Sequence, residues 1–272
     1  MSLSFEPLAD PPPALRELSL LELSRSGPVL HIRLNRPAKR NSISDELLAQ
    51  IHTVFVNVPK DIKAALISGE GEHFCAGLDL SEVSERSVAE GIVHSRSWHA
   101  CFDAIQFGPV PVIAVLHGAV VGGGLELAAS AHLRVAERSA FYGLPEGTRG
   151  IFVGGSGSVR ISRLLGVPRM TDMMLTGRVF DADDGQGFGL SNYLVDEGAG
   201  LARALELATK IAANAPLSNF AITHALPRIA DLSAADGLFM ESLMASIAQG
   251  DEAAKERVRA FLEKRAAKVQ KQ

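Results

Sequence analysis

Three glycines followed by Leu-Glu, Gly122–Glu126, come shortly after a short apolar strand pattern, Pro111–Leu116. Glycines at a strand-to-helix junction let backbone N–H groups approach a ligand oxygen, because no Cβ stands in the way. A helix predicted over Leu125–Ser130 adds the positive end of its dipole at the same place. Glu126 would put a carboxylate in the first turn of that helix. The feature predicts an α/β chain with an anion cradle beside a fixed acid, although glycine runs also occur in ordinary turns.

A second segment of the same kind is Phe74–Asp79, which also follows a strand pattern and bends at small residues. The backbone N–H of Leu78, just after Gly77, could point at the same oxygen as the N–H of Gly123. Two preorganised donors on one carbonyl oxygen form an oxyanion hole, in which one donor contributes about 3 kcal/mol of transition-state stabilisation. The alternative interpretation of each segment alone is a tight turn.

A third segment, Leu144-Pro145-Glu146, offers a second carboxylate on the loop after another strand pattern. This carboxylate could face Glu126 across a cleft. Two carboxylates can divide acid and base work when their surroundings push their pKa values apart. For an isolated Pro-Glu pair the alternative is a solvated loop glutamate.

Apolar alternation predicts strands along the chain, and helical spacing predicts the segments between them. The predicted strands are Leu18–Leu23, Val29–Leu34, Ile62–Ile67, His132–Ala136 and Ala140–Gly143, with helices opening at Ser44 and over residues 81–107. From Leu201 onward the pattern is helical. The last predicted helix, Asp251 to about Val269, is charge-rich and would pack through a narrow apolar seam, as on a neighbouring subunit.

Bulk composition limits the classes of protein. The chain has 272 residues, a net charge of −4, 47% hydrophobic and 21% charged residues, as in ordinary globular proteins. The acidic balance argues against a nucleic-acid partner, and no apolar run reaches the roughly 18 residues of a membrane span. The N-terminus lacks a secretion-signal pattern. Two cysteines, Cys75 and Cys101, are too few for a disulfide framework, so a cytoplasmic location is expected.

Other kinds of site find no support in the sequence. There is no Walker-type loop, no dinucleotide fingerprint, no His-Glu-x-x-His and no paired cysteine spacing, so no metal site is predicted. Gly154–Ser158 superficially resembles a phosphate loop but lacks the lysine.

Five motifs, taken in order, resemble those of the crotonase (enoyl-CoA hydratase/isomerase) superfamily over about Leu18 to Lys268. They are Leu34–Pro37 with Lys39–Ser42, Phe74–Asp79, Gly122–Glu126, Phe141–Glu146 and Phe261–Arg265. The resemblance implies an α/β fold with a spiral core of repeated ββα units and a C-terminal helical oligomerisation region. The expected division is a flexible arm over 1–15, a core with the acyl-CoA site over 16–200, and a helical trimerisation region over 201–272.

The resemblance also implies roles for particular residues. Glu126 and Glu146 would be the catalytic acids, and the N–H groups of Leu78 and Gly123 would form the oxyanion hole. Coenzyme A would enter as part of the substrate, with no separate cofactor, and the chain would form a homotrimer or a dimer of trimers. The residues expected to bind coenzyme A are Lys39, Arg40, Ala76, Phe261 and Lys264, the last two reaching an adjacent subunit; Trp98 and Gly154 are expected in the substrate pocket.

Both glutamates together favour hydration of a trans-2-enoyl-CoA. An isomerase or C–C lyase of the same superfamily remains an alternative, as does a CoA-binding homologue without activity. Dienoyl isomerases of the superfamily can keep both acids but add a third, eight residues past the second; Gly154 stands at that place here, which argues against that branch. Hydratases of the superfamily usually have a proline just before that glycine, where this chain has Val153. Arg149 is either a surface residue or a contact for a polar acyl tail.

Overall fold

The structure, a computed structural model, describes residues 4–82, 85–263 and 265. The chain divides into two compact units, Met1–Ala212 and Ala213–Gln272. The sequence-based division between residues 200 and 201 stays a prediction. Helix α7 (Gly200–Ala212), which begins there, packs on strands of the first unit.

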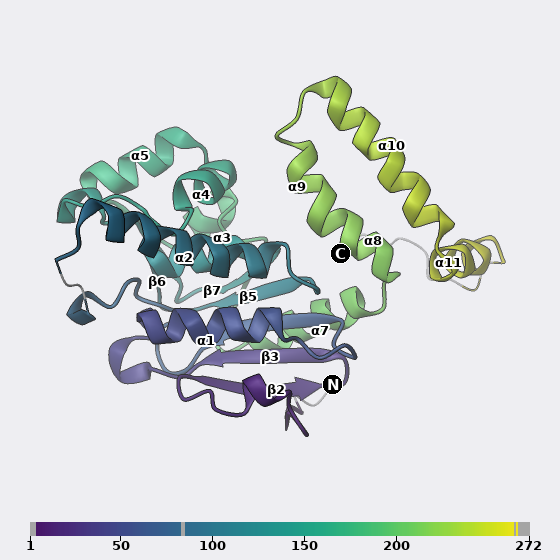
Figure 1. The fold of residues 1–272 in the computed structure, drawn as a ribbon, viewed down its shortest axis with the longest axis horizontal. Coiled ribbons are helices and arrows are strands. Elements are labelled where there is room, and N and C mark those ends of the chain that lie inside the picture. Colours follow the sequence, from purple (N-terminus) through teal and green to yellow (C-terminus); the bar gives the residue numbers. More distant parts are fainter. Residues whose placement is uncertain (1–3, 83–84, 264, 266–272) are drawn as a thin grey trace. The chain divides into compact units, whose positions relative to one another are not determined.

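The described part of the first unit contains a seven-stranded sheet in the order β1-β2-β3-β4-β5-β7-β10 (Figure 1). β1, β2 and β3 pair antiparallel, and every pairing from β3 onward is parallel. This mixed α/β architecture confirms the predicted fold class. The strands are Glu6–Pro7 (β1), Leu21–Ser26 (β2), Val29–Leu34 (β3), Ala64–Gly69 (β4), Val112–Leu116 (β5), Leu133–Glu137 (β7) and Tyr193–Val195 (β10).

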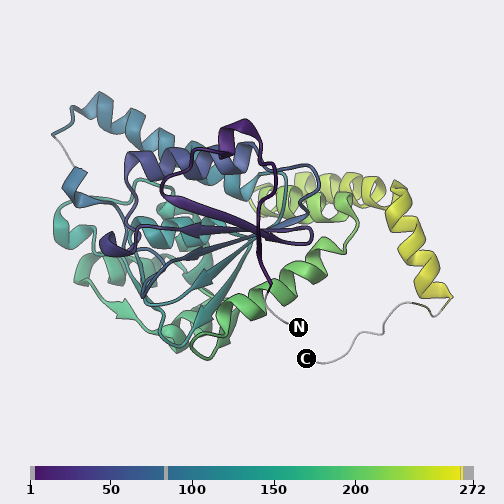
Figure 2. The same ribbon diagram turned by 90° about the horizontal axis from the view of Figure 1, so that it is seen from below.

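Helices cover both faces of this sheet. Helices α1 (Asp45–Val56) and α2 (Val88–Gln106) lie on one side, and α7 lies on the other (Figure 2). Successive residues of β3 point to opposite faces of the sheet. Leu30 belongs to the larger buried cluster, and Val29 belongs to the cluster packed around α7. Parallel strands covered on both faces are expected to be apolar, as all of β5 and the first four residues of β4 are.

A smaller sheet of β6 (Ala119–Val121), β8 (Phe141–Gly143) and β9 (Val179–Phe180) carries the segments singled out in the sequence. β6 and β8 are parallel, which places the chain leaving each strand at the same edge. The N–H of Gly122 donates to the carbonyl of Gly143 at 2.9 Å, so the pairing continues one residue past β6. The two strand ends therefore bring the glycine run and the Glu146 loop together.

Several predicted boundaries differ from the structure. β2 begins at Leu21 and β4 at Ala64, each a few residues after the apolar pattern starts. Helix α2 begins at Val88 rather than 81, because Ser87 forms a capping box with Glu90. In the glycine run, α3 (Gly123–Ser130) begins two residues before Leu125, since Gly122 at φ +54° makes the turn itself.

Several short elements were not predicted. Within the arm 1–15, β1 pairs with β2, and Leu15 is the buried last residue of a 3₁₀ turn, Pro13–Leu15. Between β8 and α7 the chain adds three further helices. These helices are α4 (Gly157–Leu165), α5 (Val167–Thr176) and α6 (Ala182–Phe188). Elsewhere in the described chain, further 3₁₀ turns span Pro37–Lys39, Leu80–Glu82 and Gly147–Arg149.

The second unit is helical, as the sequence predicts. It comprises α8 (Pro216–Phe220), a π-helical turn at Ala221–Ala225, α9 (Leu226–Ile229), α10 (Ala234–Gly250) and α11 (Glu252–Leu262). The end of α11 at Leu262 falls short of the predicted Val269, and residues 266–272 lie outside the described residues. One face of α10 remains exposed through Leu238, Phe239, Leu243 and Ile247. In the described chain, none of the helices is both long enough and apolar enough to cross a membrane.

Candidate active site

The backbone N–H groups of Leu78 and Gly123 lie close together where the segment 74–79 passes the glycine run. A Cβ on Gly123 would lie 3.5 Å from the nitrogen of Leu78, and one on Gly77 would lie 3.5 Å from the nitrogen of Gly123. Within the described residues, no backbone hydrogen bond uses the N–H of Leu78 or of Gly123. Two neighbouring donors left without a partner form the arrangement that an oxyanion hole requires.

The loop around Asn41 holds the Leu78 segment in place. The Asn41 side chain is buried, and its amide donates to the carbonyls of Glu70 and His73 at 2.9 and 2.7 Å. The N–H of Asp79 donates to Ile43 at 2.9 Å, and its carboxylate pairs with Arg36 at 3.0 Å. A hydrogen bond from the Ser81 hydroxyl is the main cause that lowers the pKa of Asp79, so this anchor is ionised.

Glycine is required at two positions because other groups of the site occupy the space of a Cβ. A Cβ on Gly122 would lie 2.8 Å from Oε1 of Glu146. A Cβ on Gly123 would lie 2.7 Å from the ring of Trp98. The glycine run therefore lets the second acid and the indole approach the backbone that carries the N–H donor.

Glu126 is a buried carboxyl held at one oxygen. Only 3% of the residue is exposed, and Oε1 accepts hydrogen bonds from the N–H groups of Gly155 and Gly157 at 2.9 and 2.6 Å. Burial raises the pKa of Glu126 to about 7, helped by the charge of Glu146 and opposed by the two backbone hydrogen bonds. This pKa suits a group that exchanges protons near neutrality.

Glu146 is buried as well, so the solvated-loop alternative for it is wrong. The residue is 7% exposed, and Oε2 has no hydrogen-bond partner among the described residues. Burial raises its pKa, while its own backbone and the guanidinium of Arg149 act in the opposite direction. Burial therefore favours the protonated form of each carboxyl, and the charge of Glu146 adds to this effect at Glu126.

A single cavity of about 420 Å³ joins these groups. Seven of the predicted site residues line it, together with Arg149. They are Ala76, Leu78, Trp98, Gly123, Glu126, Glu146 and Gly154. Their roles stay predictions, but their common location is the arrangement that the predicted chemistry needs.

Lys39 and Arg40 are not among the residues that line this cavity. Lys39 ends the 3₁₀ turn Pro37–Lys39 and Arg40 follows it, and the N–H of Ala76 donates to the Arg40 carbonyl at 3.0 Å, so their loop adjoins the cavity wall. Phe261 is an exposed residue of α11 in the second unit. Lys264 lies outside the described residues.

The sequence analysis missed the N–H groups of Gly155 and Gly157. The signal was present in the run Gly154–Ser158, which resembles a phosphate loop without its lysine. The run does bind an anion, but the anion is the Glu126 carboxylate of the same chain. No cluster of His, Cys, Asp or Glu side chains suited to a metal is found in the part of the chain that the structure describes.

Comparison with known proteins identifies the family. A family model described as enoyl-CoA hydratase/isomerase matches residues 24–272. The 2,3-dehydroadipyl-CoA hydratase of Escherichia coli is 33% identical over 91% of this chain and 97% of its own. The short-chain-enoyl-CoA hydratase of Clostridium acetobutylicum is 31% identical over 92% and 97%.

Solved structures agree in fold. A crystal structure from Rhodopseudomonas palustris is 57% identical, with a TM-score of 0.89 over 93% of this chain and 98% of the other. The enoyl-CoA hydratase of Bacillus anthracis is 30% identical, with a TM-score of 0.84 over 90% and 96%. The chain belongs to the enoyl-CoA hydratase/isomerase family, the crotonase superfamily that its motifs resemble.

Proposed function

We propose that the protein adds water across the C2–C3 double bond of a trans-2-enoyl-CoA thioester. The observation that carries the proposal is a cavity lined by two buried carboxyls, Glu126 and Glu146, and by two backbone N–H groups that have no partner among the described residues. That combination supplies a base, an acid and an anion cradle.

The thioester carbonyl oxygen would accept hydrogen bonds from the N–H groups of Leu78 and Gly123. Water attacks C3, its proton passes to Glu126, and the C2–C3 electron pair moves toward the carbonyl to give an enolate-like state. The two donors stabilise that negative charge, each by about 3 kcal/mol. Glu146 then gives its proton to C2, which leaves a 3-hydroxyacyl thioester.

The proposed sequence assigns one protonation state to each acid. The reaction begins with Glu126 ionised and Glu146 protonated, which is one proton for the pair. Two backbone hydrogen bonds favour the ionised form of Glu126. Oε2 of Glu146 has no such donor among the described residues, which favours its protonated form.

Coenzyme A would be bound as part of the substrate by Lys39, Arg40 and Ala76. Phe261 and Lys264 of an adjacent subunit complete this part of the proposal, in a homotrimer or a dimer of trimers. The exposed apolar face of α10 supports assembly, since a helix face of this kind is normally covered by a partner. A cytoplasmic location belongs to the same proposal and is supported by two cysteines that are both buried free thiols.

The test is incubation with crotonyl-CoA, followed by loss of the conjugated thioester absorbance and by product mass. We expect a product heavier by one water, whereas an isomerase product keeps the substrate's mass. Glu126→Gln and Glu146→Gln should each lose about 10²-fold or more in kcat. Glu206→Gln is the control, because Glu206 is an exposed residue of α7 paired with Lys210. Full activity in either site variant would refute the assigned roles.

A further inference from the structure

Arg149 brings a positive charge into the wall of the cavity. It ends the 3₁₀ turn that follows Glu146, and its backbone N–H donates to the Glu146 carbonyl at 3.0 Å. The guanidinium opposes the rise of the Glu146 pKa, so its charge is felt at the acid. An arginine at this place can therefore influence what the cavity binds.

The two arginines that line the cavity differ in their partners. Arg86 forms an ion pair with Asp45 at 3.3 Å, and Asp45 also accepts a hydrogen bond from His94 at 2.8 Å. For the Arg149 guanidinium, the described residues provide neither a hydrogen bond nor an ion pair. Arginine carries five N–H donors in a fork that matches a carboxylate. The donors of Arg149 are thus available to a ligand.

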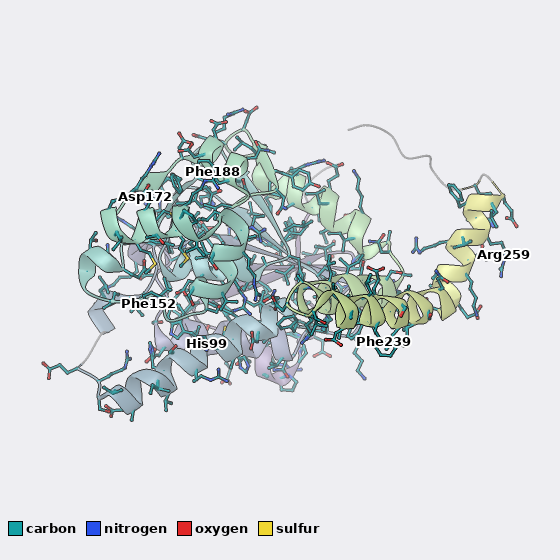
Figure 3. All side chains as sticks on the ribbon, turned by 90° about the horizontal axis from the view of Figure 1, so that it is seen from above. His99, Phe152, Asp172, Phe188, Phe239 and Arg259 are labelled. Atoms are coloured by element: carbon teal, nitrogen blue, oxygen red, sulfur yellow. The ribbon has the colours of Figure 1, made fainter. Side chains whose placement is uncertain are left out.

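The wall next to Arg149 is apolar. Ile151 and Phe152 follow it in the chain, are exposed by 48% and 69%, and line the same cavity, as does Leu80 at 51%. Phe152 is labelled in Figure 3, where it extends from the loop between the 3₁₀ turn and α4. An exposed apolar wall fits a hydrocarbon chain, and a cation beside it fits an anion on that chain.

We propose that Arg149 makes the site selective for acyl groups that carry a carboxylate at the end remote from the thioester. This inference rests on the proposed function, because it assigns the cavity to the acyl part of an enoyl-CoA. The guanidinium would bind the carboxylate through two parallel N–H···O bonds, while Ile151 and Phe152 cover the methylene chain. The phosphates of coenzyme A are the other anions that such a cation could bind.

The experiment compares two trans-2-enoyl-CoA esters of equal chain length, one ending in a methyl group and one in a carboxylate. Both carry the same coenzyme A, so a phosphate contact affects them equally. The change in the Glu146 pKa caused by removing a charge at position 149 also affects both equally. The ratio of kcat/KM for the carboxylate ester to kcat/KM for the methyl ester therefore isolates recognition of the carboxylate.

In Arg149→Gln we expect kcat/KM for the carboxylate ester, relative to that for the methyl ester, to fall about tenfold. In Arg149→Lys the fall should be smaller, because the charge remains. Arg138→Gln is the matched control, since Arg138 is an exposed arginine paired with Asp183 and Asp196. An equal loss for both esters in Arg149→Gln would indicate a phosphate contact and overturn the proposal. An unchanged ratio would also overturn it.

A binding measurement separates this inference from the hydratase proposal. The saturated esters that correspond to the two substrates are titrated calorimetrically into the wild type and Arg149→Gln. Tighter binding of the carboxylate ester that is lost in Arg149→Gln supports the inference even if neither enoyl ester is hydrated, an outcome that refutes only the hydratase proposal. Equal binding of both esters to the wild type overturns the inference. Because Arg149 is exposed, we expect unchanged thermal unfolding in the variant.

Discussion

Replacing Gly122 by alanine tests whether the second acid depends on a missing Cβ. Gly122 has φ +54°, a conformation that costs an L-residue about 1–3 kcal/mol. Its Cβ would lie 2.8 Å from Oε1 of Glu146, closer than a methyl group and a carboxylate oxygen can approach. Glu146 must therefore move, and a misplaced proton donor of this kind costs about 10²-fold in rate. That loss corresponds to about 2.7 kcal/mol of transition-state stabilisation.

Gly27 provides the matched control. It has φ +56° in the turn between β2 and β3, and a Cβ there would meet nothing within 4 Å. Gly27→Ala should therefore lose stability from backbone strain alone and keep its activity. Thermal unfolding by circular dichroism gives the stability change, and hydration of crotonyl-CoA gives kcat. If folded Gly122→Ala retains the kcat of Gly27→Ala within about threefold, the steric argument about Glu146 is refuted.

Four further predictions concern Glu126 and the assembly. The pKa of Glu126 is raised from 4.5 to about 7 in the folded protein, so between these pH values the folded state binds a proton that the unfolded state has lost. The free energy of unfolding should therefore fall by up to about 3 kcal/mol as the pH rises from 4.5 to 7. Urea titrations at several pH values measure this slope, which Glu126→Gln should abolish. The kcat of the wild type should rise with pH through an apparent pKa near 7, and a flat profile would contradict the role of Glu126 as the base. Gly157→Ala places a Cβ 2.8 Å from Oε1 of Glu126 and should lower kcat about 10-fold or more while moving the acid limb of the pH profile upward. Phe239→Asp on the exposed face of α10 should reduce the molar mass seen by light scattering, and an unchanged mass would show that this face does not hold the assembly together.

Local chemistry explains which parts of the site could be predicted from the sequence. Gly122–Glu126 was informative because glycine, a strand end and an acid stand within a few residues of one another. The pairing of Leu78 with Gly123 needed two such segments and the assumption that both end at one sheet edge. The parallel bridge between Cys75 and Val120, which joins the segment 74–79 to β6, agrees with that assumption.

Contacts between distant segments explain what the sequence left out. The bonds from Gly155 and Gly157 to Glu126 join residues about thirty positions apart, and no periodicity records them. Glu146 lies close to Gly122, which is more than twenty positions earlier in the chain, and its Pro-Glu context does not record that proximity. Strands of two or three residues, such as β9 and β10, give too short an alternation to separate from a loop.

The hydrogen bonds at Oε1 make the two oxygens of Glu126 chemically unequal. With Oε1 accepting from Gly155 and Gly157, a proton taken from water in the proposed mechanism would settle on Oε2. The attacking water would then lie at one edge of the carboxyl group and would reach the flat double bond from one face. We therefore expect a single enantiomer of the 3-hydroxyacyl product, set by where two glycine N–H groups point.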